Sequence, residues 1–308
     1  WSSDVCSSDL RLTYNQYVRL MIGEALAYLA RLVATVCGYA PDSQEARWVA
    51  AALDTWARLR GIVLRDYPIP PDAMREAELP APMAFLVSLN LDYRYRRLYF
   101  VIHTINRFYP RLVDPEFCGV TPGTLDAFKR EVYVCLETLQ ARETADFLSA
   151  DCRAAIRRVF PQVEREAAGP RALPDVERYV AEHEQAMTAV IDEIGEQGDF
   201  VGFNEGADAV LSSVAFHALG PACRRGLLIA YIGFVFWDII VLPMLGARAQ
   251  HKLGELGEIM VDRISPDDAT TIRQGDAARG LQGADFANFG AFLSRSAREN
   301  DRSEEHTS

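Results

Sequence analysis

The sequence predicts a mainly α fold, a multi-helix globular domain with at most a short strand or hairpin near residues 258–264. Three observations support this prediction. Apolar residues recur at steps of three and four along most of the chain, as they do on one face of an α-helix. Prolines and glycines separate these periodic segments. Only residues 258–264 alternate weakly between apolar and polar, as a strand does.

Length and composition set the limits of what the chain can be. It has 308 residues, 49% hydrophobic and 24% charged, which is enough for one large or two ordinary globular cores and excludes disorder. The net charge of −11 argues against nucleic acid as a partner, because the chain as a whole does not attract it by bulk charge; this leaves room for a local basic surface. Arginine supplies 30 of the 32 basic residues, a skew that indicates GC-rich codon usage in a bacterium.

Both ends of the chain resemble sequencing adapters rather than protein. Residues 4–10 read DVCSSDL and residues 302–308 read RSEEHTS, similar to in-frame translations of a common adapter and its reverse complement. We therefore predict that residues 1–10 and 302–308 are adapter-derived artefacts of metagenomic sequence, and we set them aside. The genuine segment is expected to run from Arg11 to Asp301 and to be a fragment of a longer protein.

Residues 11–82 predict a helical hairpin followed by a proline-rich linker. The first helix is expected over residues 13–37, where an apolar stripe contains Tyr14, Val18, Met21, Ala25, Leu29, Leu32 and Val36. A second helix is expected over residues 42–61. Five prolines between residues 67 and 82 then predict a linker or an extended surface loop, because proline fixes φ and removes a backbone donor.

The remainder, residues 83–301, predicts a second and larger helical domain. Helices are expected over residues 91–109, 121–148, 149–160, 174–195, 205–219 and 221–246, with another after Ser265 and an apolar helical pattern around Phe286. Residues 195–206 are rich in glycine and acidic residues, which predicts a loop rather than a phosphate site, because carboxylates repel phosphate.

The clearest amphipathic pattern lies over residues 91–109. Its apolar face carries Leu91, Leu98, Ile102 and Ile105, and the opposite half of the helical wheel carries Arg94, Arg96, Arg97, Arg107 and Arg111. These five arginines are candidates to face anionic lipid headgroups. The alternative, which we favour, is a basic face that contacts the rest of the protein or solvent and pairs with Asp and Glu residues of this acidic chain.

One run, Gly226 to Gly246, is long and apolar enough to cross a membrane, and Arg224 and Arg225 flank it. Asp238 lies inside the run, where a carboxylate is costly in a bilayer, and Pro243 disfavours a helix that continues to the end. We therefore favour a fully buried core helix, with membrane insertion as the alternative.

Catalytic and metal-binding motifs do not emerge from the sequence. It has no G-x-S-x-G serine, no Walker A motif and no H-E-x-x-H pair, so we predict no catalytic, cofactor-binding or metal residue and no cofactor. His217 lies among apolar residues and is expected to be a hydrogen-bonded core histidine, whereas His183 is expected on a solvated charged face. The five cysteines outside the two ends predict free, buried thiols, because their spacing matches no zinc or redox signature.

A family resemblance comes from three stretches in a fixed order. These stretches are LDYRYRRLYFVIHTINRFYP (residues 91–110), LIAYIGFVFWDIIVLPML with GEIMVDRISPDDAT (residues 228–245 and 257–270), and FANFGAFLSRSAREND (residues 286–301). Together they resemble the C-terminal domain of unknown function of bacterial patatin-related proteins, a patatin-like phospholipase group. The resemblance covers most of residues 83–301, so these residues are expected to form a helical accessory domain of such a protein.

The resemblance implies that the parent protein hydrolyses lipid esters with a serine–aspartate dyad on an N-terminal patatin-like domain. Neither dyad residue maps onto this sequence, so the fragment is expected to be inactive alone, with that catalytic domain as its partner in cis. A membrane lipid surface is a further expected partner. We expect a cytoplasmic location, with peripheral attachment to the inner membrane as the alternative. The alternative function is a stand-alone helical interaction or membrane-associated protein without enzymatic activity.

Overall fold

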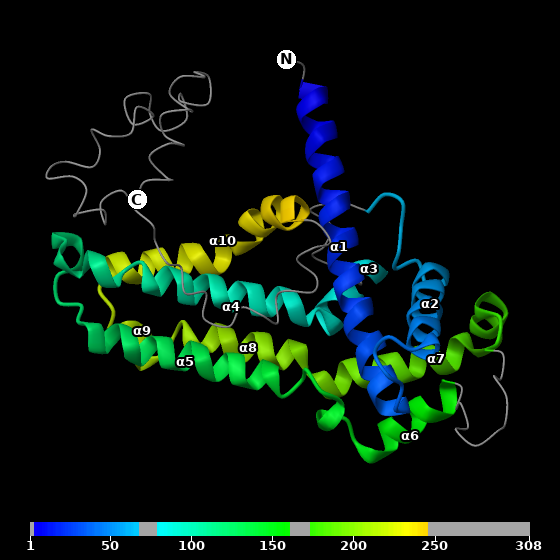
Figure 1. The fold of residues 1–308 in the computed structure, drawn as a ribbon. Helices are drawn as coiled ribbons and strands as arrows, with labels where there is room; N and C mark the ends of the chain where they lie inside the picture. The colour runs from blue at the N-terminus through cyan, green and yellow to red at the C-terminus, as the bar shows by residue number, and fades with distance from the viewer. Residues whose placement is uncertain (1–2, 68–78, 161–172, 246–308) are drawn as a thin grey trace, which may run out of the picture. The chain divides into compact units, whose positions relative to one another are not determined.

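The computed structural model describes residues 3–67, 79–160 and 173–245 (Figure 1). Within these ranges all regular structure is helical and no strand occurs, which confirms the predicted fold class. The α-helices are α1 (Ser3–Cys37), α2 (Gln44–Leu59), α3 (Ala81–Leu89), α4 (Leu91–Asn106), α5 (Pro122–Gln140), α6 (Ala150–Val159), α7 (Val176–Gly198), α8 (Phe200–Val210), α9 (Val214–His217) and α10 (Pro221–Leu245). Short 3₁₀ helices are η2 (Tyr109–Val113), η3 (Pro115–Phe117) and η4 (Ala145–Phe147).

Several sequence predictions fall on residues outside these ranges. They are the strand or hairpin near 258–264, the helix after Ser265 and the apolar pattern around Phe286. Most of the proline-rich stretch lies outside as well. Where that stretch re-enters the described residues, α3 begins at Ala81 with a proline in its first turn, a position where the missing donor costs nothing.

Helix α1 is the helix around which much of the core is built. Six of the seven residues in its predicted apolar stripe are buried, and the seventh, Tyr14, packs against the core. The helix packs against α2, α3, α4, α6 and α10. Neighbours on so many sides explain why buried residues also occur elsewhere on the surface of α1, such as Ile22, Tyr28 and Val33. The predicted hairpin with α2 is present, since these two helices pack on each other.

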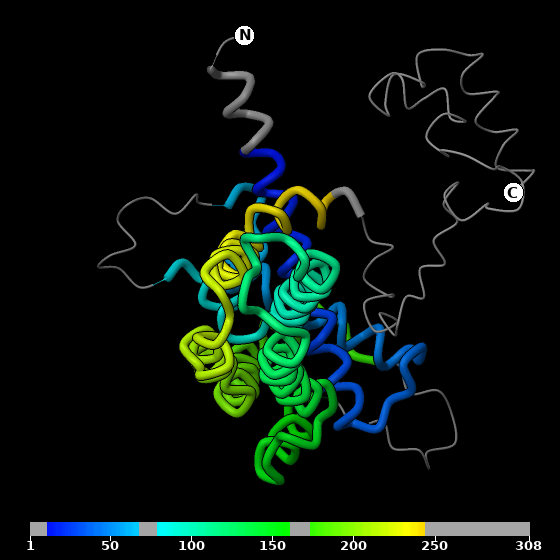
Figure 2. The backbone as a smooth tube through the Cα atoms, turned by 90° about the vertical axis from the view of Figure 1, so that its left-hand side faces the viewer, coloured from blue at the N-terminus to red at the C-terminus, as the bar shows by residue number. Residues whose placement is uncertain are grey.

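Helices α4, α5, α8 and α10 form a second packed group, which Figure 2 shows nearly end-on. α4 packs against both α10 and α5, and α5 packs against α8. Arg96 of α4 bonds to Asp238 near the end of α10, while Phe108, just after α4, lies against Gly226 near the start of α10. The two helices are therefore antiparallel.

Local sequence signals explain most helix starts. The side chains of Ser43, Thr121 and Ser149 each accept a backbone N–H in the first turn of α2, α5 and α6. Such N-caps satisfy donors that the helix itself leaves unpaired. The predicted starts at Thr121-Pro122 and Ser149 are confirmed.

One predicted loop is wrong. Residues 195–206 are helical except for Asp199, which joins α7 to α8 with a left-handed φ of 43°. The Asp199 carboxylate accepts the Gly202 N–H at 3.0 Å and so caps α8. A single aspartate thus separates the two helices where the glycines predicted a longer loop. Aspartate tolerates the left-handed backbone region, and its carboxylate accepts a backbone N–H that α8 leaves unpaired.

The chain divides into two compact units, residues 1–253 and residues 254–308. All described residues belong to the first unit. The domain division expected near residue 82 stays a prediction.

Candidate functional site

Three arginines of α4, which we call the arginine cluster (Arg94, Arg96 and Arg97), bond to groups inside the protein. Arg94 and Arg96 are buried and Arg97 is half-buried. The interpretation of these side chains as lipid-facing is therefore wrong for Arg94 and Arg96. The favoured alternative, a basic face that contacts the rest of the protein, holds for them, because each arginine joins α4 to another helix.

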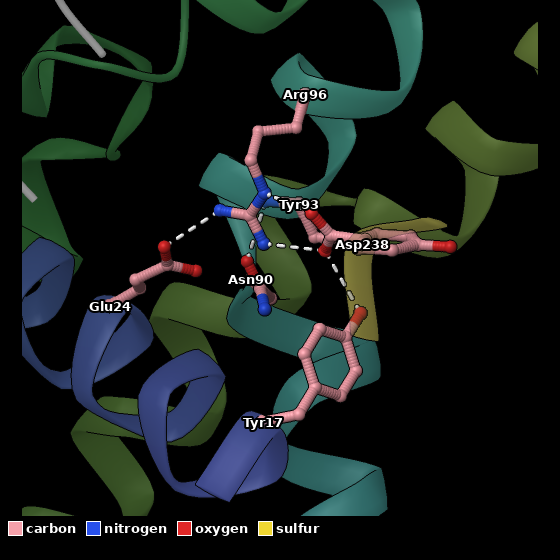
Figure 3. A network of polar contacts seen from close by, with 6 residues as sticks. All are labelled: Tyr17, Glu24, Asn90, Tyr93, Arg96 and Asp238. Carbon is pink, nitrogen blue, oxygen red and sulfur yellow. Dashed lines mark hydrogen bonds and ion pairs between the residues drawn. The ribbon is translucent and has the colours of Figure 1, made fainter. Parts of the chain in front are cut away.

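Arg96 lies at the centre of a buried ionic network (Figure 3). Its Nε and Nη2 donate to Oδ1 and Oδ2 of Asp238 on α10, each at 2.9 Å, and its Nη1 donates to Oε1 of Glu24 on α1 at 2.7 Å. Tyr17 of α1 donates its hydroxyl to Oδ2 of Asp238 at 2.9 Å. We call these four residues the Arg96 network. It links α1, α4 and α10 through one guanidinium, whose planar fork suits two carboxylates at once.

The Arg96 network contains two carboxylates for one cation. Burial raises the pKa of Glu24 to about 7, although Arg96 opposes this shift. Oε2 of Glu24 is buried without a hydrogen-bond partner. A proton on this oxygen would therefore not disturb the bond that Oε1 accepts from Arg96. Glu24 therefore holds a proton below neutral pH, while Asp238 forms the bidentate pair with Arg96.

Arg94 is buried without a carboxylate. Its guanidinium donates to the backbone carbonyls of Asn90 at 2.5 Å and Val87 at 2.6 Å, and to Oδ1 of Asn204 at 3.1 Å. It also lies over the ring of Phe200, 4.7 Å from the centroid. Burial lowers the pKa of Arg94 to about 10. Arg94 thus ties the α3–α4 junction to α8 through carbonyl dipoles and an aromatic face rather than an ion pair.

Arg97 joins α4 to α10 and, indirectly, to α8. Its Nη2 donates to the hydroxyl of Tyr231 at 2.8 Å, and that hydroxyl donates to Oδ1 of Asp208 at 2.6 Å. The guanidinium lies 4.1 Å from the centroid of the Tyr231 ring. Burial raises the pKa of Tyr231, so the phenol stays protonated and serves as a relay between an arginine and an aspartate.

The other two candidate lipid-facing residues, Arg107 and Arg111, are exposed at the end of α4 and in η2. Arg111 forms ion pairs with Asp114 and Glu116 and lies over the Phe117 ring. Arg107 has no ion-pair partner among the described residues. Of the five candidate arginines, these two are the ones that a headgroup can approach.

Helix α10 has one buried side and one exposed side. Leu227, Tyr231, Phe234, Asp238 and Leu242 are buried against the protein. The exposed apolar side chains, which we call the outward face of α10, are Leu228, Ile229, Ile232, Phe236, Trp237 and Ile240. The prediction of a fully buried core helix is therefore wrong. α10 covers nearly all of the helix expected over residues 221–246 and includes Pro243, which removes one backbone donor from its last turn.

Two described helices are long and apolar enough to cross a membrane, namely Arg11–Cys37 within α1 and Pro221–Pro243 within α10. Buried core helices of soluble proteins and signal sequences pass the same test of length and composition. The two helices therefore give only weak evidence of membrane association.

The described residues contain no group of three or more His, Cys, Asp or Glu side chains able to hold a metal ion. A cleft of about 490 Å³ between α2, α3, α7 and α8 has Trp56 and Phe85 in its wall but neither histidine nor cysteine. His217 is exposed, against the prediction of a core histidine. Cys135, Cys152 and Cys223 are buried free thiols as predicted, whereas Cys118 is exposed.

Residues 221–302 match the domain family described as "Protein of unknown function (DUF3376)". The match begins with the first residue of α10 and supports a domain of unknown function at this end of the chain, which confirms the coarser part of the predicted family. No curated protein and no solved structure matches the chain.

Sequence reasoning missed the partners of Arg96, although a signal was available. Glu24 stands in the apolar pattern of α1, and Asp238 is the one charged residue between Gly226 and Leu245. A lone charge on an apolar helix face is costly unless a partner is buried with it. Matching these two acids with the arginines of α4 would have predicted the network.

Proposed function

We propose that this chain is a fragment of a patatin-like lipid acyl hydrolase, comprising its helical C-terminal accessory region without the serine–aspartate dyad. A catalytic domain of the same protein would then be its partner in cis. The proposal places the chain in lipid metabolism as a supporting region of a phospholipase or lipase, and it assigns no catalytic residue to the chain.

The observation that carries the proposal is the packing of α4 against α10. α4 comes from the first stretch that resembles the patatin-related proteins, and α10 contains most of the second. Although more than 100 residues separate them, the two helices are antiparallel neighbours joined by the Arg96–Asp238 pair. Stretches that resemble one family and also pack together support a single structural unit. In this proposal the accessory region includes α4 in addition to the domain match at residues 221–302.

The side-chain chemistry is consistent with a supporting role. The guanidinium groups of the arginine cluster donate to carboxylates, to a tyrosine hydroxyl, to an asparagine side chain and to backbone carbonyls. Such bonds hold helices together, and none of them activates a nucleophile. Acyl transfer through a covalent intermediate needs a nucleophile beside a base.

The test is hydrolysis by the isolated chain. We expect no turnover of p-nitrophenyl butyrate above buffer, and no labelling by a serine-reactive fluorophosphonate probe. The genomic reading frame upstream of Arg11 is expected to encode a G-x-S-x-G turn after a strand pattern. Turnover that the probe abolishes stoichiometrically would refute the fragment's inactivity, and a start codon just before Arg11 would refute the acyl hydrolase parent.

The second candidate function is a stand-alone helical protein that associates with membranes. The outward face of α10 favours it, because large apolar side chains there are exposed from Leu228 to Ile240. The upstream reading frame separates the two functions directly.

A further inference from the structure

The outward face of α10 is an unusual surface for a folded protein. Ile229, Ile232, Phe236 and Ile240 are between 59% and 72% exposed, and their spacing of three or four residues puts them in one row along the helix. Trp237 and Leu228 flank this row. Scattered exposed apolar residues are ordinary, whereas a continuous row of this size marks a binding surface.

The row has a basic end. Arg224 and Arg225 lie in the first turns of α10. Arg107 directly follows the last residue of α4, and the next residue, Phe108, contacts Gly226 of α10. None of these three arginines has an ion-pair partner among the described residues. The surface therefore combines cationic groups at one end with an uncharged apolar row.

A shallow groove lies where these two parts meet. It has a volume of about 390 Å³ and is lined by Phe216, Pro221, Arg224, Arg225, Leu228 and Ile229. Two guanidinium groups beside an apolar floor suit a molecule with an anionic head and a hydrocarbon tail, because arginine binds phosphate through several donors at once.

The bonds on the opposite side of α10 argue against this helix crossing a bilayer by itself. If α10 left the other helices to span a membrane, Asp238 would lose its bonds to Arg96 and Tyr17, and Tyr231 would lose its bond to Arg97. The helix would then expose a carboxylate to hydrocarbon. With these bonds intact, only the outward face is available, as in helices that lie in the plane of the membrane interface.

We propose that the outward face of α10 binds the surface of an anionic phospholipid bilayer. The apolar row enters the boundary between headgroups and acyl chains, and Arg224, Arg225 and Arg107 contact lipid phosphates. This inference concerns the described helices alone and does not depend on an acyl hydrolase parent. It assigns lipid contact to α10 and the end of α4, not to Arg94 or Arg96.

The first test is vesicle flotation of the 308-residue chain. We expect it to float with phosphatidylglycerol–phosphatidylcholine vesicles, to bind phosphatidylcholine alone about tenfold more weakly, and to be released by sodium carbonate. The double variant Ile232→Gln/Phe236→Gln should bind at least about tenfold more weakly, since each side chain loses apolar burial. The variant Arg224→Gln/Arg225→Gln should lose most of the preference for anionic vesicles, about tenfold.

Matched controls separate the surface from general effects. Leu59→Gln/Val201→Gln changes apolar residues that are more than half exposed on α2 and α8, and Arg130→Gln/Arg158→Gln changes exposed arginines on α5 and α6. Both are expected to bind vesicles as the parent chain does, with unchanged helical circular dichroism. Equal losses in control and face variants would overturn the proposal, as would no vesicle binding at all.

The second test reports the position of the face directly. Trp237 is expected to be quenched by phospholipids brominated on the upper acyl chain, and Trp237→Phe should remove this quenching while it keeps vesicle binding. Unquenched Trp237 in bound protein would overturn the proposal. Light scattering without lipid tests whether a second copy of the chain covers the outward face. A dimer that becomes monomeric in the Ile232→Gln/Phe236→Gln variant would show such a copy and would overturn the proposal.

Discussion

The two longest apolar helices of this protein's described residues, α1 and α10, use their apolar surface in opposite ways. In the most apolar window of α1, 61% of the residues are buried, compared with 33% in α10. α1 packs against other helices on several sides, and the core closes around it. α10 packs through one side, against α4 and α1 above all, and leaves Ile232, Phe236 and Ile240 exposed. Both helices are long and apolar enough to count as candidate membrane spans, whereas their packing distinguishes them.

The comparison singles out Asp238, a carboxylate buried among the apolar residues on the inward side of α10. The inward side of α10 carries its one buried charged residue, Asp238, and the outward face carries none. A surface helix of a soluble protein has the reverse distribution, with apolar residues inside and charges outside. α1 contributes Glu24 to the same arginine, so the Arg96 network is where the two helices meet. Each prediction below changes one side of this comparison.

The largest effect is expected from Asp238→Ala. Removal of this carboxylate leaves Arg96 buried with only Glu24 as its acidic partner, and Tyr17 loses its acceptor. Breaking a buried pair from one side costs about 3–5 kcal/mol. We therefore expect a fall of that size in the free energy of unfolding, measured by urea denaturation followed by circular dichroism.

The matched control for Asp238→Ala is Asp54→Ala, which breaks the exposed pair between Asp54 and Arg58 on α2. An exposed pair of this kind contributes about 0–1 kcal/mol. If both variants lose the same stability, the Arg96 network does not anchor α10, and the contrast between the two sides of this helix loses its explanation.

A second prediction compares apolar residues on the two helices. Leu29 of α1 is fully buried and Ile232 of α10 is 67% exposed. Leu29→Ala should cost about 2–5 kcal/mol of unfolding free energy, since it opens a cavity in the core, whereas Ile232→Ala should stay within about 0.5 kcal/mol. Urea denaturation of both variants measures the difference. An equally large cost at Ile232 would mean that the outward face is covered in the lipid-free protein.

Sequence patterns predicted much of this fold and little of the candidate site, for a physical reason. Helical periodicity depends on neighbours three and four residues away, so it located α1, α4 and the N-caps at Thr121 and Ser149. Which helix side meets the core depends on partners far along the chain. A wheel with arginines opposite leucines therefore predicted an outer basic face, whereas Arg96 finds its carboxylates 72 residues upstream and 142 residues downstream. The exposed side of α10 escaped prediction similarly, because hydropathy cannot distinguish a core from a binding surface.

The smallest of these effects concerns Glu24, the carboxylate that α1 contributes. Its pKa rises from 4.5 to about 7 on folding, chiefly because it is buried. Between these values the folded protein binds more protons than the unfolded chain. The Glu24 contribution to stability is therefore complete below pH 4.5 and is lost as the pH rises through about 7. Between pH 5 and pH 8 the loss should be on the order of 2 kcal/mol.

Glu24→Gln keeps the acceptor for Arg96 but cannot ionise, so it should remove this pH dependence. Relative to the parent chain, the variant should gain on the order of 2 kcal/mol between pH 5 and pH 8 in urea denaturation. The exposed Glu137 on α5 gives the control, because Glu137→Gln should leave the pH profile unchanged. A Glu24→Gln profile parallel to that of the parent would mean that Glu24 is ionised throughout. Burial would then not raise the pKa of Glu24, and this carboxylate of α1 would pair with Arg96 as an ion throughout.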